Sequence, residues 1–214
     1  PTVEATPAPE PTPTAAPTPT PTPETPTPPP ECDGMDCFRA FAVLIEGALA
    51  DKHAQLFIDR AQLTEVSCTG QEEMGPCAGR QAGTVNSGVW YGLWRTDAVG
   101  LVSPEKVGTN FDSFASMAAM AESDSFGTAE AVLYALASSP SGIFGEEESF
   151  YAILTGIFAS LEGPERRIAA YEFVFDSGSW RLRAVVEAGA LFEDWLSGEC
   201  DFCYDHWERW EGTP

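Results

Sequence analysis

Residues 167–187 constrain the fold of this chain more than any other stretch. Two runs rich in β-branched and aromatic residues, "RIAAYEFVF" and "SWRLRAVVE", are joined through "DSGS", in which Ser177 and Gly178 suit a two-residue hairpin turn. That turn sets apolar residues opposite one another on one face: Phe175 and Trp180, Phe173 and Leu182, Tyr171 and Ala184. On the other face it sets Glu172 opposite Arg183. The sequence therefore predicts an antiparallel hairpin with one buried face and one solvent-facing charge pair.

Helical and strand-like patterns lead up to this hairpin. Apolar residues recur at three- and four-residue spacing from Phe38 to Leu49, which predicts a helix. After a break near Asp51, a shorter helix is expected to end near Leu63. Ser103 is a candidate helix N-cap, and the alanine-rich stretch 111–122 is again helical. Further strands are predicted at 64–68, 84–94, 129–138 and 149–160, which makes the expected fold class α+β with a closing four-strand antiparallel meander.

The order of these elements resembles that of the nuclear transport factor two-like superfamily, also called SnoaL-like or cystatin-type cone proteins. The stretches that carry the resemblance are "LIEGALADKHAQLFIDRAQLTEVS" near the start and "YEFVFDSGSWRLRAV" near the end, and it extends from residue 38 to about residue 190. The resemblance implies N-terminal helices packed on a curved, cone-like antiparallel sheet, with an apolar pocket inside the cone.

Aromatic residues are the candidates for lining that implied pocket: Tyr134, Tyr151, Tyr171 and Trp180. Simple core packing of these side chains is the alternative interpretation. Members of the superfamily act as isomerases, dehydratases, cyclases or ligand binders, and several of the enzymes use an Asp or His inside the pocket. No catalytic residue is assigned here, because the predicted register turns Glu172 outward and His53 lies in the helical break, where a solvated side chain is expected.

Residues 1–31 form a segment of a different kind. The first thirty residues contain thirteen prolines, nine threonines and no aromatic residue, so they bury too little apolar surface to fold. Proline favours the polyproline II conformation, so a semi-rigid stalk of roughly 90 Å is predicted. Alternating Thr and Pro is typical of stalks outside the cytoplasm, and the segment resembles those of bacterial surface lipoproteins. A disordered tail without a task is the alternative.

Six cysteines lie in three close pairs: Cys32 and Cys37, Cys68 and Cys77, Cys200 and Cys203. Their even number beside a stalk of this kind favours disulfides, and the obvious bridge joins Cys68 to Cys77 across a Gly- and Pro-containing loop. The other four cysteines either pair locally or cross-link the two ends of the globular region. A metal site formed by Cys200, Cys203 and His206 is one alternative, and a thioredoxin-type redox couple is another.

Charge and missing motifs exclude several classes of partner. Eleven basic residues face 33 acidic ones, and the formal net charge of -22 opposes binding to nucleic acid or to an anionic membrane. No apolar run reaches the roughly eighteen residues of a transmembrane helix. The dinucleotide, phosphate-loop, zinc-protease and serine-hydrolase motifs are absent from the sequence, and no cofactor is expected.

The expected organisation has three parts: a stalk at 1–31, an α+β domain at 32–198, and a tail at 199–214 that docks on the domain. In the tail, Trp207 and Trp210 share helical spacing. The expected function is that of an extracytoplasmic, surface-tethered, non-catalytic domain that binds a small apolar ligand or a cell-surface partner. A secreted SnoaL-like enzyme and a structural subunit of a surface layer or filament are the alternatives, and the oligomeric state stays open.

Overall fold

The computed structural model describes residues 34–93, 99–120, 131–142, 147–160, 163–188 and 206–212. The predicted stalk, both predicted domain boundaries, Cys32, Cys200 and Cys203 lie outside the described residues. Three α-helices are described: α1 (Met35–Ala50), α2 (Gln55–Arg60) and α3 (Pro104–Met120). One short 3-10 helix, η1, covers Gly75–Cys77. The strands are β1 (Thr64–Ser67), β2 (Val85–Leu93), β3 (Val99–Val102), β4 (Val132–Ser139), β5 (Ser149–Ser160), β6 (Gly163–Asp176), β7 (Ser179–Ala188) and β8 (His206–Arg209).

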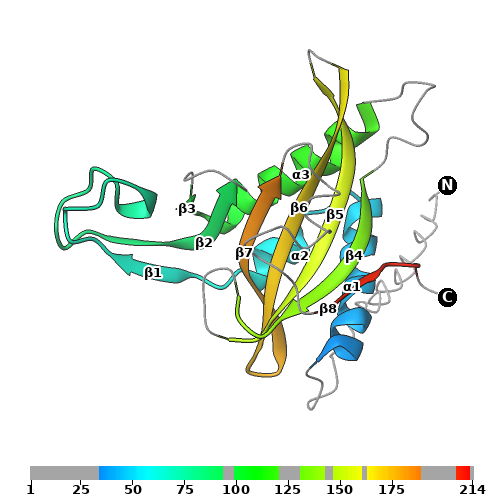
Figure 1. Ribbon diagram of the computed structural model, residues 1–214, viewed down its shortest axis with the longest axis horizontal. Coiled ribbons are helices and arrows are strands. Elements are labelled where there is room, and N and C mark those ends of the chain that lie inside the picture. The colour runs from blue at the N-terminus through cyan, green and yellow to red at the C-terminus, as the bar shows by residue number, and fades with distance from the viewer. Residues whose placement is uncertain are drawn as a thin grey trace, which may run out of the picture.

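The described strands form one eight-stranded sheet in the order β1-β2-β7-β6-β5-β4-β8, with β3 also paired to β2. Figure 1 shows the three helices together on one face of this sheet, so the predicted α+β class is confirmed. Strands β4 to β7 form the predicted antiparallel meander. The prediction of a wholly antiparallel sheet is wrong, because β2 joins β7 in parallel with Tyr91 opposite Val185. The long connection between them, which contains α3 and the meander, makes a parallel pairing possible.

The helices follow the apolar periodicity, but their ends depend on the sheet. Phe38, Phe41 and Ile45 lie about one turn apart on the buried side of α1. Helix α2 ends at Arg60 rather than near Leu63, because the chain then runs alongside the sheet and the Gln62 amide donates to the Leu182 carbonyl.

Helix α3 begins where the sequence places its cap. The hydroxyl oxygen of Ser103 accepts from the Lys106 amide at 3.3 Å, and Pro104 occupies the first helical position, where no backbone donor is needed. The alanine-rich stretch continues this same helix, which the described residues follow to Met120.

The face of the sheet under the helices, called the inner face here, is filled by an aromatic core. Trp180 is 1 % exposed and its ring centroid lies 4.9 Å from that of Phe38. Tyr171 is equally buried, 4.7 Å from Phe57 on α2. Burial of each large side chain of this kind stabilises the fold by about 1.5–3 kcal/mol, so this layer holds helices and sheet together.

The predicted register of the β6–β7 hairpin is correct near its turn and wrong beyond it. Ser177 and Gly178 both have positive φ, 50° and 79°, as a tight hairpin turn requires. The nearest pairs are as predicted: Phe175 with Trp180 and Phe173 with Leu182. Beyond an irregularity the pairs shift by one: Glu172 with Ala184 and Tyr171 with Val185. Arg183 is the extra residue of this bulge, so the predicted pairing of Tyr171 with Ala184 is wrong.

The opposite face of the sheet, called the outer face here, is buried as well. Its mostly small and apolar side chains form a second cluster that includes Ala135, Tyr151 and Val186. The predicted pairing of Glu172 with Arg183 is wrong, because Glu172 pairs with Ala184. The two side chains nevertheless meet on this face, with Arg183 Nε donating to Glu172 Oε1 at 2.8 Å.

The predicted solvent exposure of that charge pair is wrong. Glu172 is 0 % exposed and Arg183 is 7 % exposed. Other groups fill the space around the pair: the Ser149 hydroxyl accepts from Arg183 Nη2 at 2.5 Å. Gly142 lies so close that a Cβ at this position would overlap both charged side chains. The charge pair is thus part of the interior rather than of a solvated surface.

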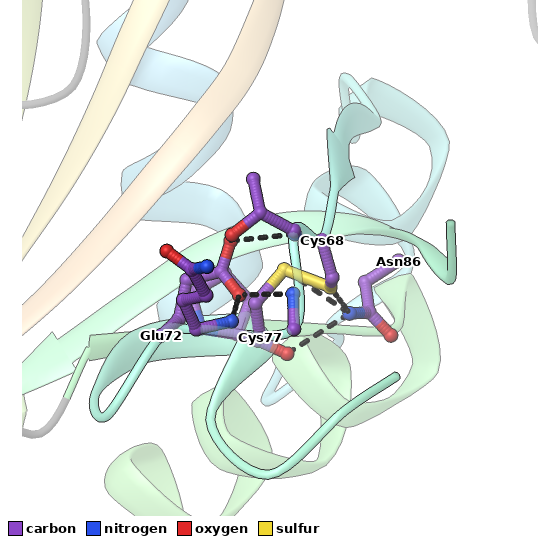
Figure 2. The surroundings of a disulfide bond; sticks show 8 residues. Cys68, Glu72, Cys77 and Asn86 are labelled. Carbon is purple, nitrogen blue, oxygen red and sulfur yellow. Dashed lines mark hydrogen bonds between the residues drawn. A yellow bond between two sulfur atoms is a disulfide. The ribbon is translucent and has the colours of Figure 1, made fainter. Parts of the chain in front are cut away.

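β1 and the first half of β2 project from the body as a two-stranded arm, residues 64–88 (Figure 1). The predicted disulfide between Cys68 and Cys77 is confirmed at the end of this arm, with Cα atoms 5.3 Å apart. Figure 2 shows the bridge lying between Glu72 on one side and Asn86 on the other. The Asn86 amide donates to the Pro76 carbonyl at 2.9 Å, which ties β2 to the loop. A two-stranded ribbon is marginal by itself, and these links stabilise it.

Glu72 organises the loop inside the bridge. Its carboxylate accepts from the Thr69 amide at 2.7 Å, from the Thr69 hydroxyl at 2.8 Å and from the Gly70 amide at 2.9 Å. These hydrogen bonds, with that from the Thr69 amide the strongest, lower the pKa of Glu72 from 4.5 to about 2. The carboxylate acts here as the centre of a small turn.

The C-terminal residues add β8 to the sheet edge beside β4, with Trp207 opposite Ala137. The helical spacing predicted for Trp207 and Trp210 is wrong, because pairing with β4 makes this segment a strand. Two contacts join it to α1: Arg39 Nη2 to Glu208 Oε1 at 2.6 Å, and Trp210 Nε1 to Glu46 Oε1 at 3.0 Å. Cys37 on α1 is disulfide-bonded, and its partner lies outside the described residues.

Within the described ranges, no helix has the length and apolar character needed to cross a membrane.

Candidate functional site

The four aromatic residues predicted to line a pocket are divided between the two faces of the sheet. Tyr171 and Trp180 belong to the inner-face core, whereas Tyr151 is buried in the outer-face cluster and Tyr134 packs against that cluster. The sheet separates these two pairs, so the structure does not bring the four together. In addition, Arg209 lies over the Tyr134 ring at 5.3 Å, a cation–π contact that occupies this ring.

Tyr171 and Trp180 share a face but not a cavity. Neighbouring rings surround each of them: Phe57 and Phe111 beside Tyr171, and Phe38, Phe41, Phe150 and Phe175 beside Trp180. These contacts pack both side chains into the aromatic core of the inner face.

A cavity of about 120 Å³ lies at one end of the inner face, between α3 and the sheet. Its walls come from four elements: Tyr91 on β2, Asn110, Ser113 and Phe114 on α3, Arg167 and Ile168 on β6, and Glu187 on β7. Sequence reasoning did not single out any of these residues as a site residue. The lining combines two apolar side chains with five that carry polar groups, so it is more polar than that of most small-molecule sites.

Strand pairing explains how the polar side chains converge. Side chains alternate along a strand, so Arg167 shares the inner face with Ala169, which pairs with Glu187 on the neighbouring strand. The parallel pairing of β2 with β7 sets Tyr91 opposite Val185, two residues before Glu187. Three strands thus place the guanidinium of Arg167, the carboxylate of Glu187 and the phenol of Tyr91 at the same end of the sheet.

Two phenols near this cavity hold their protons strongly. Burial, the charge of Glu187 and a hydrogen bond with Glu187 raise the pKa of Tyr91 well above its ordinary value of 10. Burial, followed by the charge of Glu187, likewise raises the pKa of Tyr171. Both hydroxyl groups therefore remain neutral and can act as hydrogen-bond donors throughout the neutral pH range.

Helix α3 contributes acceptors and further donors. The Ser113 hydroxyl donates to the Thr109 carbonyl at 2.8 Å, so its oxygen is presented as an acceptor. The Asn110 amide, one turn earlier on the same face, provides both a donor and an acceptor. The site can hold a small molecule that carries charge and hydrogen-bonding groups.

The other sequence candidates lie elsewhere. His53 is exposed in the break after α1, as expected, and Glu172 is enclosed with Arg183 on the outer face. Of the alternative metal site, only His206 falls within the described residues, where it is exposed on β8. In the part of the chain that the structure describes, no three His, Cys, Asp or Glu residues are grouped as metal ligands would be.

Comparison with known proteins assigns no family. No protein-family model matches the sequence. No curated protein matches it either. Among solved structures, the chain is similar to a calcium/calmodulin-dependent protein kinase II association domain from Xanthomonas campestris, with 12% identity and a TM-score of 0.36. The similarity covers 75% of this chain and 91% of that one, and at this degree of overlap it does not establish membership of a family.

Proposed function

We propose that this chain is an extracytoplasmic, surface-tethered, non-catalytic binding domain whose cavity between α3 and the sheet holds a compact polar ligand. The observation that carries the proposal is the convergence of Tyr91, Arg167 and Glu187 on one cavity of about 120 Å³. The three side chains are half-buried, and polar groups that converge on one cavity are a feature of ligand sites, so this group is a candidate.

The size of the cavity limits the ligand. A dry cavity of about 150 Å³ in another protein holds benzene, so this one suits a molecule of similar or smaller size. The polar lining also favours a polar ligand over the apolar one that the sequence suggests, because the aromatic core occupies the apolar part of the inner face.

The non-catalytic part of the proposal rests on the phenols. A general base must release and accept a proton near the working pH, whereas the pKa of Tyr91 is raised far above that range. Tyr91 therefore serves as a fixed donor that orients Glu187. The enzyme alternative would require turnover of a bound molecule.

The location rests on two features of the chain. Disulfides such as Cys68–Cys77 persist in oxidising compartments, and the Pro- and Thr-rich residues 1–31 have the composition of a stalk. A stalk of this kind would lift the binding domain away from the surface to which it is attached.

The finer architecture is also a proposal: a cone-like fold of the nuclear transport factor two-like type. Helices gathered on one face of a long antiparallel meander support it (Figure 1). A crystal structure would test it by the curvature of the sheet around α3.

A binding screen tests the function. The protein is mixed with a panel of small polar and small apolar compounds, and binding is read by ligand-observed NMR. Ser113 and Ser116 are both exposed on α3, but Ser113 lines the cavity and Ser116 does not. Ser113→Trp therefore places a large ring at the cavity, and Ser116→Trp is the matched control. We expect polar compounds to bind the parent protein and Ser116→Trp but not Ser113→Trp. Binding that survives in Ser113→Trp, or no binding at all, would overturn the proposal.

A further inference from the structure

We infer that the ligand of this cavity is a small neutral primary amide, held through its amide group by Asn110 and Ser113 on α3. This inference rests on the proposed function and narrows it to one chemical class, of which acetamide and urea are simple members. Both side chains that carry the inference lie in the wall of the cavity.

The wall that the sheet contributes does not require a charged ligand. Arg167 and Glu187 carry opposite charges and are diagonal neighbours, because Glu187 pairs with Ala169, two residues along the strand from Arg167. The Tyr91 phenol donates to the Glu187 carboxylate, and Arg167 has a contact of its own within the structure. These charged side chains are half-buried, so solvent reaches them too. Their charges are therefore balanced without a ligand, and a neutral molecule brings no unpaired charge into the site.

The wall that α3 contributes is where hydrogen-bonding capacity remains. Asn110 is half-buried, and its side-chain amide forms no hydrogen bond with another of the described residues. This amide offers two N–H donors and one carbonyl acceptor. The Ser113 hydroxyl donates its proton to the Thr109 carbonyl at 2.8 Å, so its oxygen remains as an acceptor. A ligand that meets both side chains thus needs N–H donors together with an acceptor.

The spacing of the two residues suits a single amide group. Asn110 and Ser113 are three positions apart on α3, so their Cβ atoms lie roughly 5–6 Å from each other on one face of the helix. An NH2 group between them can donate one N–H to the Asn110 carbonyl and the other to the Ser113 oxygen. The carbonyl of the same ligand amide then accepts from the Asn110 NH2 group, which completes a reciprocal pair of hydrogen bonds.

Ions of similar size match this wall less well. A carboxylate has no N–H to donate to the Ser113 oxygen, and an ammonium has no acceptor for the Asn110 NH2 group. The formal net charge of -22 also repels small anions from the protein. A primary amide satisfies both side chains and is not affected by this repulsion.

The remaining lining limits the rest of the molecule. Phe114 and Ile168 are its two apolar side chains, and they provide a surface for a short alkyl group. Acetamide and propionamide have fewer non-hydrogen atoms than benzene and fit a cavity of about 120 Å³. Benzamide is larger than benzene and is too large for it.

Titration of the parent protein is the first test, with five probes: acetamide, acetate, acetone, glycerol and benzamide. Acetate and acetone have nearly the shape of acetamide but lack its N–H donors, and acetone is also neutral. We expect acetamide to bind at least about tenfold more tightly than the other four. A molecule this small reaches a Kd of roughly tens of micromolar at best, so the titrations extend to millimolar concentrations. The NMR signals of the Asn110 side-chain NH2 group report binding at this wall.

Variants then test the two side chains. Asn110→Asp keeps the shape of the side chain but removes its N–H donors, so it should weaken acetamide binding by about tenfold. Ser113→Ala removes one acceptor and should weaken it by roughly threefold. Gln81→Glu makes the same amide-to-carboxylate change at an exposed position of the arm, and Ser116→Ala is the control on α3. Calorimetry gives the affinities of the variants, and circular dichroism checks that each is folded.

The outcomes distinguish this inference from the proposed function. If other polar compounds occupy the cavity, as judged by loss of binding in Ser113→Trp, but acetamide binds no more tightly than acetate, acetone or glycerol, the amide inference fails and the binding function stands. If acetamide binds equally well to Asn110→Asp or to Ser113→Trp, it is not held as described and the inference also fails. If nothing polar binds the parent protein, both fail.

Discussion

Arg183 donates from Nε to Glu172 Oε1 at 2.8 Å in the interior of the protein, where the carboxylate has no exposure to solvent. A bulge adds Arg183 to β7 next to Ala184, the residue that pairs with Glu172 on β6. A buried ion pair contributes little net stability when intact but is costly to break, because the remaining charge stays buried.

Glu172→Leu is therefore expected to lower the free energy of unfolding by about 3–5 kcal/mol. The double variant Glu172→Leu/Arg183→Met removes both charges and should lose less than the single variant. Urea denaturation measures both, with the exposed Glu65→Leu as the control. In the single variant Arg183 keeps only the exposed Glu147, at 3.6 Å, as an anionic partner. A double variant at least as unstable as Glu172→Leu would contradict the view that this poorly compensated charge dominates the loss.

Alkaline pH should destabilise the protein through Tyr91 and Tyr171. Burial is the main cause that raises the pKa of both phenols above the ordinary value of 10. The unfolded chain releases these protons once the pH exceeds 10, while the folded chain retains them. Their contribution to stability is thus fully present below pH 10 and declines as the pH rises above it.

Tyr91→Phe cannot release a proton, so its stability should fall less steeply above pH 10 than that of the parent protein. Urea midpoints measured across that range give the slope. Tyr134→Phe, at the half-buried tyrosine on β4, is the control. Equal slopes for Tyr91→Phe and the parent would show that Tyr91 titrates normally.

Acid should loosen the loop at the end of the arm through Glu72. Its pKa is lowered from 4.5 to about 2, so its contribution is present above pH 4.5 and is lost as the pH falls through about 2. In Glu72→Gln the Thr69 and Gly70 amides should exchange faster at neutral pH, and the difference from the parent should disappear near pH 2. Glu73→Gln, at the next residue, is the matched control. Unchanged exchange in Glu72→Gln would show that the carboxylate does not hold the loop.

Removal of the bridge should affect the arm more than the core. In the chain-entropy model a loop of this length is stabilised by roughly 2–3 kcal/mol. Two backbone hydrogen bonds close the arm beside the bridge, from the Cys68 amide to the Thr84 carbonyl and from the Gly83 amide to the Cys68 carbonyl. The double variant Cys68→Ala/Cys77→Ala should therefore lower the hydrogen-exchange protection of the backbone amides at positions 68 and 83 by up to about a hundredfold. Amides of β6 should change little, and an equal loss there would show that arm and core unfold together.

Local chemistry made parts of this fold predictable. The turn at Ser177 and Gly178 and the alternation around it were sufficient to predict the hairpin as far as Phe173 and Leu182. The cap at Ser103 and the bridge between Cys68 and Cys77 depend on residues a few positions apart, and both are present. In each case the interacting residues are close in sequence, which is where pattern reasoning is strongest.

Non-local pairing accounts for what was missed. The bulge at Arg183 leaves no sequence signature, yet it moves Glu187 from the outer face, where the uninterrupted register would put it, to the inner face. The parallel pairing that places Tyr91 at the same end of the sheet joins segments about a hundred residues apart. The entropy of closing so long a loop depends only weakly on its length, so the sequence does not indicate which distant segments pair. The candidate site therefore depends on one bulge and one crossover. The visible signal in the sequence was one charged residue at the far end of each predicted hairpin strand, Arg167 and Glu187.

The contact between α1 and β8 has a mechanical consequence. Tension that reaches the domain through the residues before Met35 is applied first to α1, and the bond from Arg39 to Glu208 passes it to the strand at the sheet edge. The link from Trp210 to Glu46 lies two turns further along α1 and joins the same two segments a second time. The two ends of the domain thus restrain each other at one edge, and a pull on either end is borne by α1, β8 and β4 before it reaches the ligand cavity at α3.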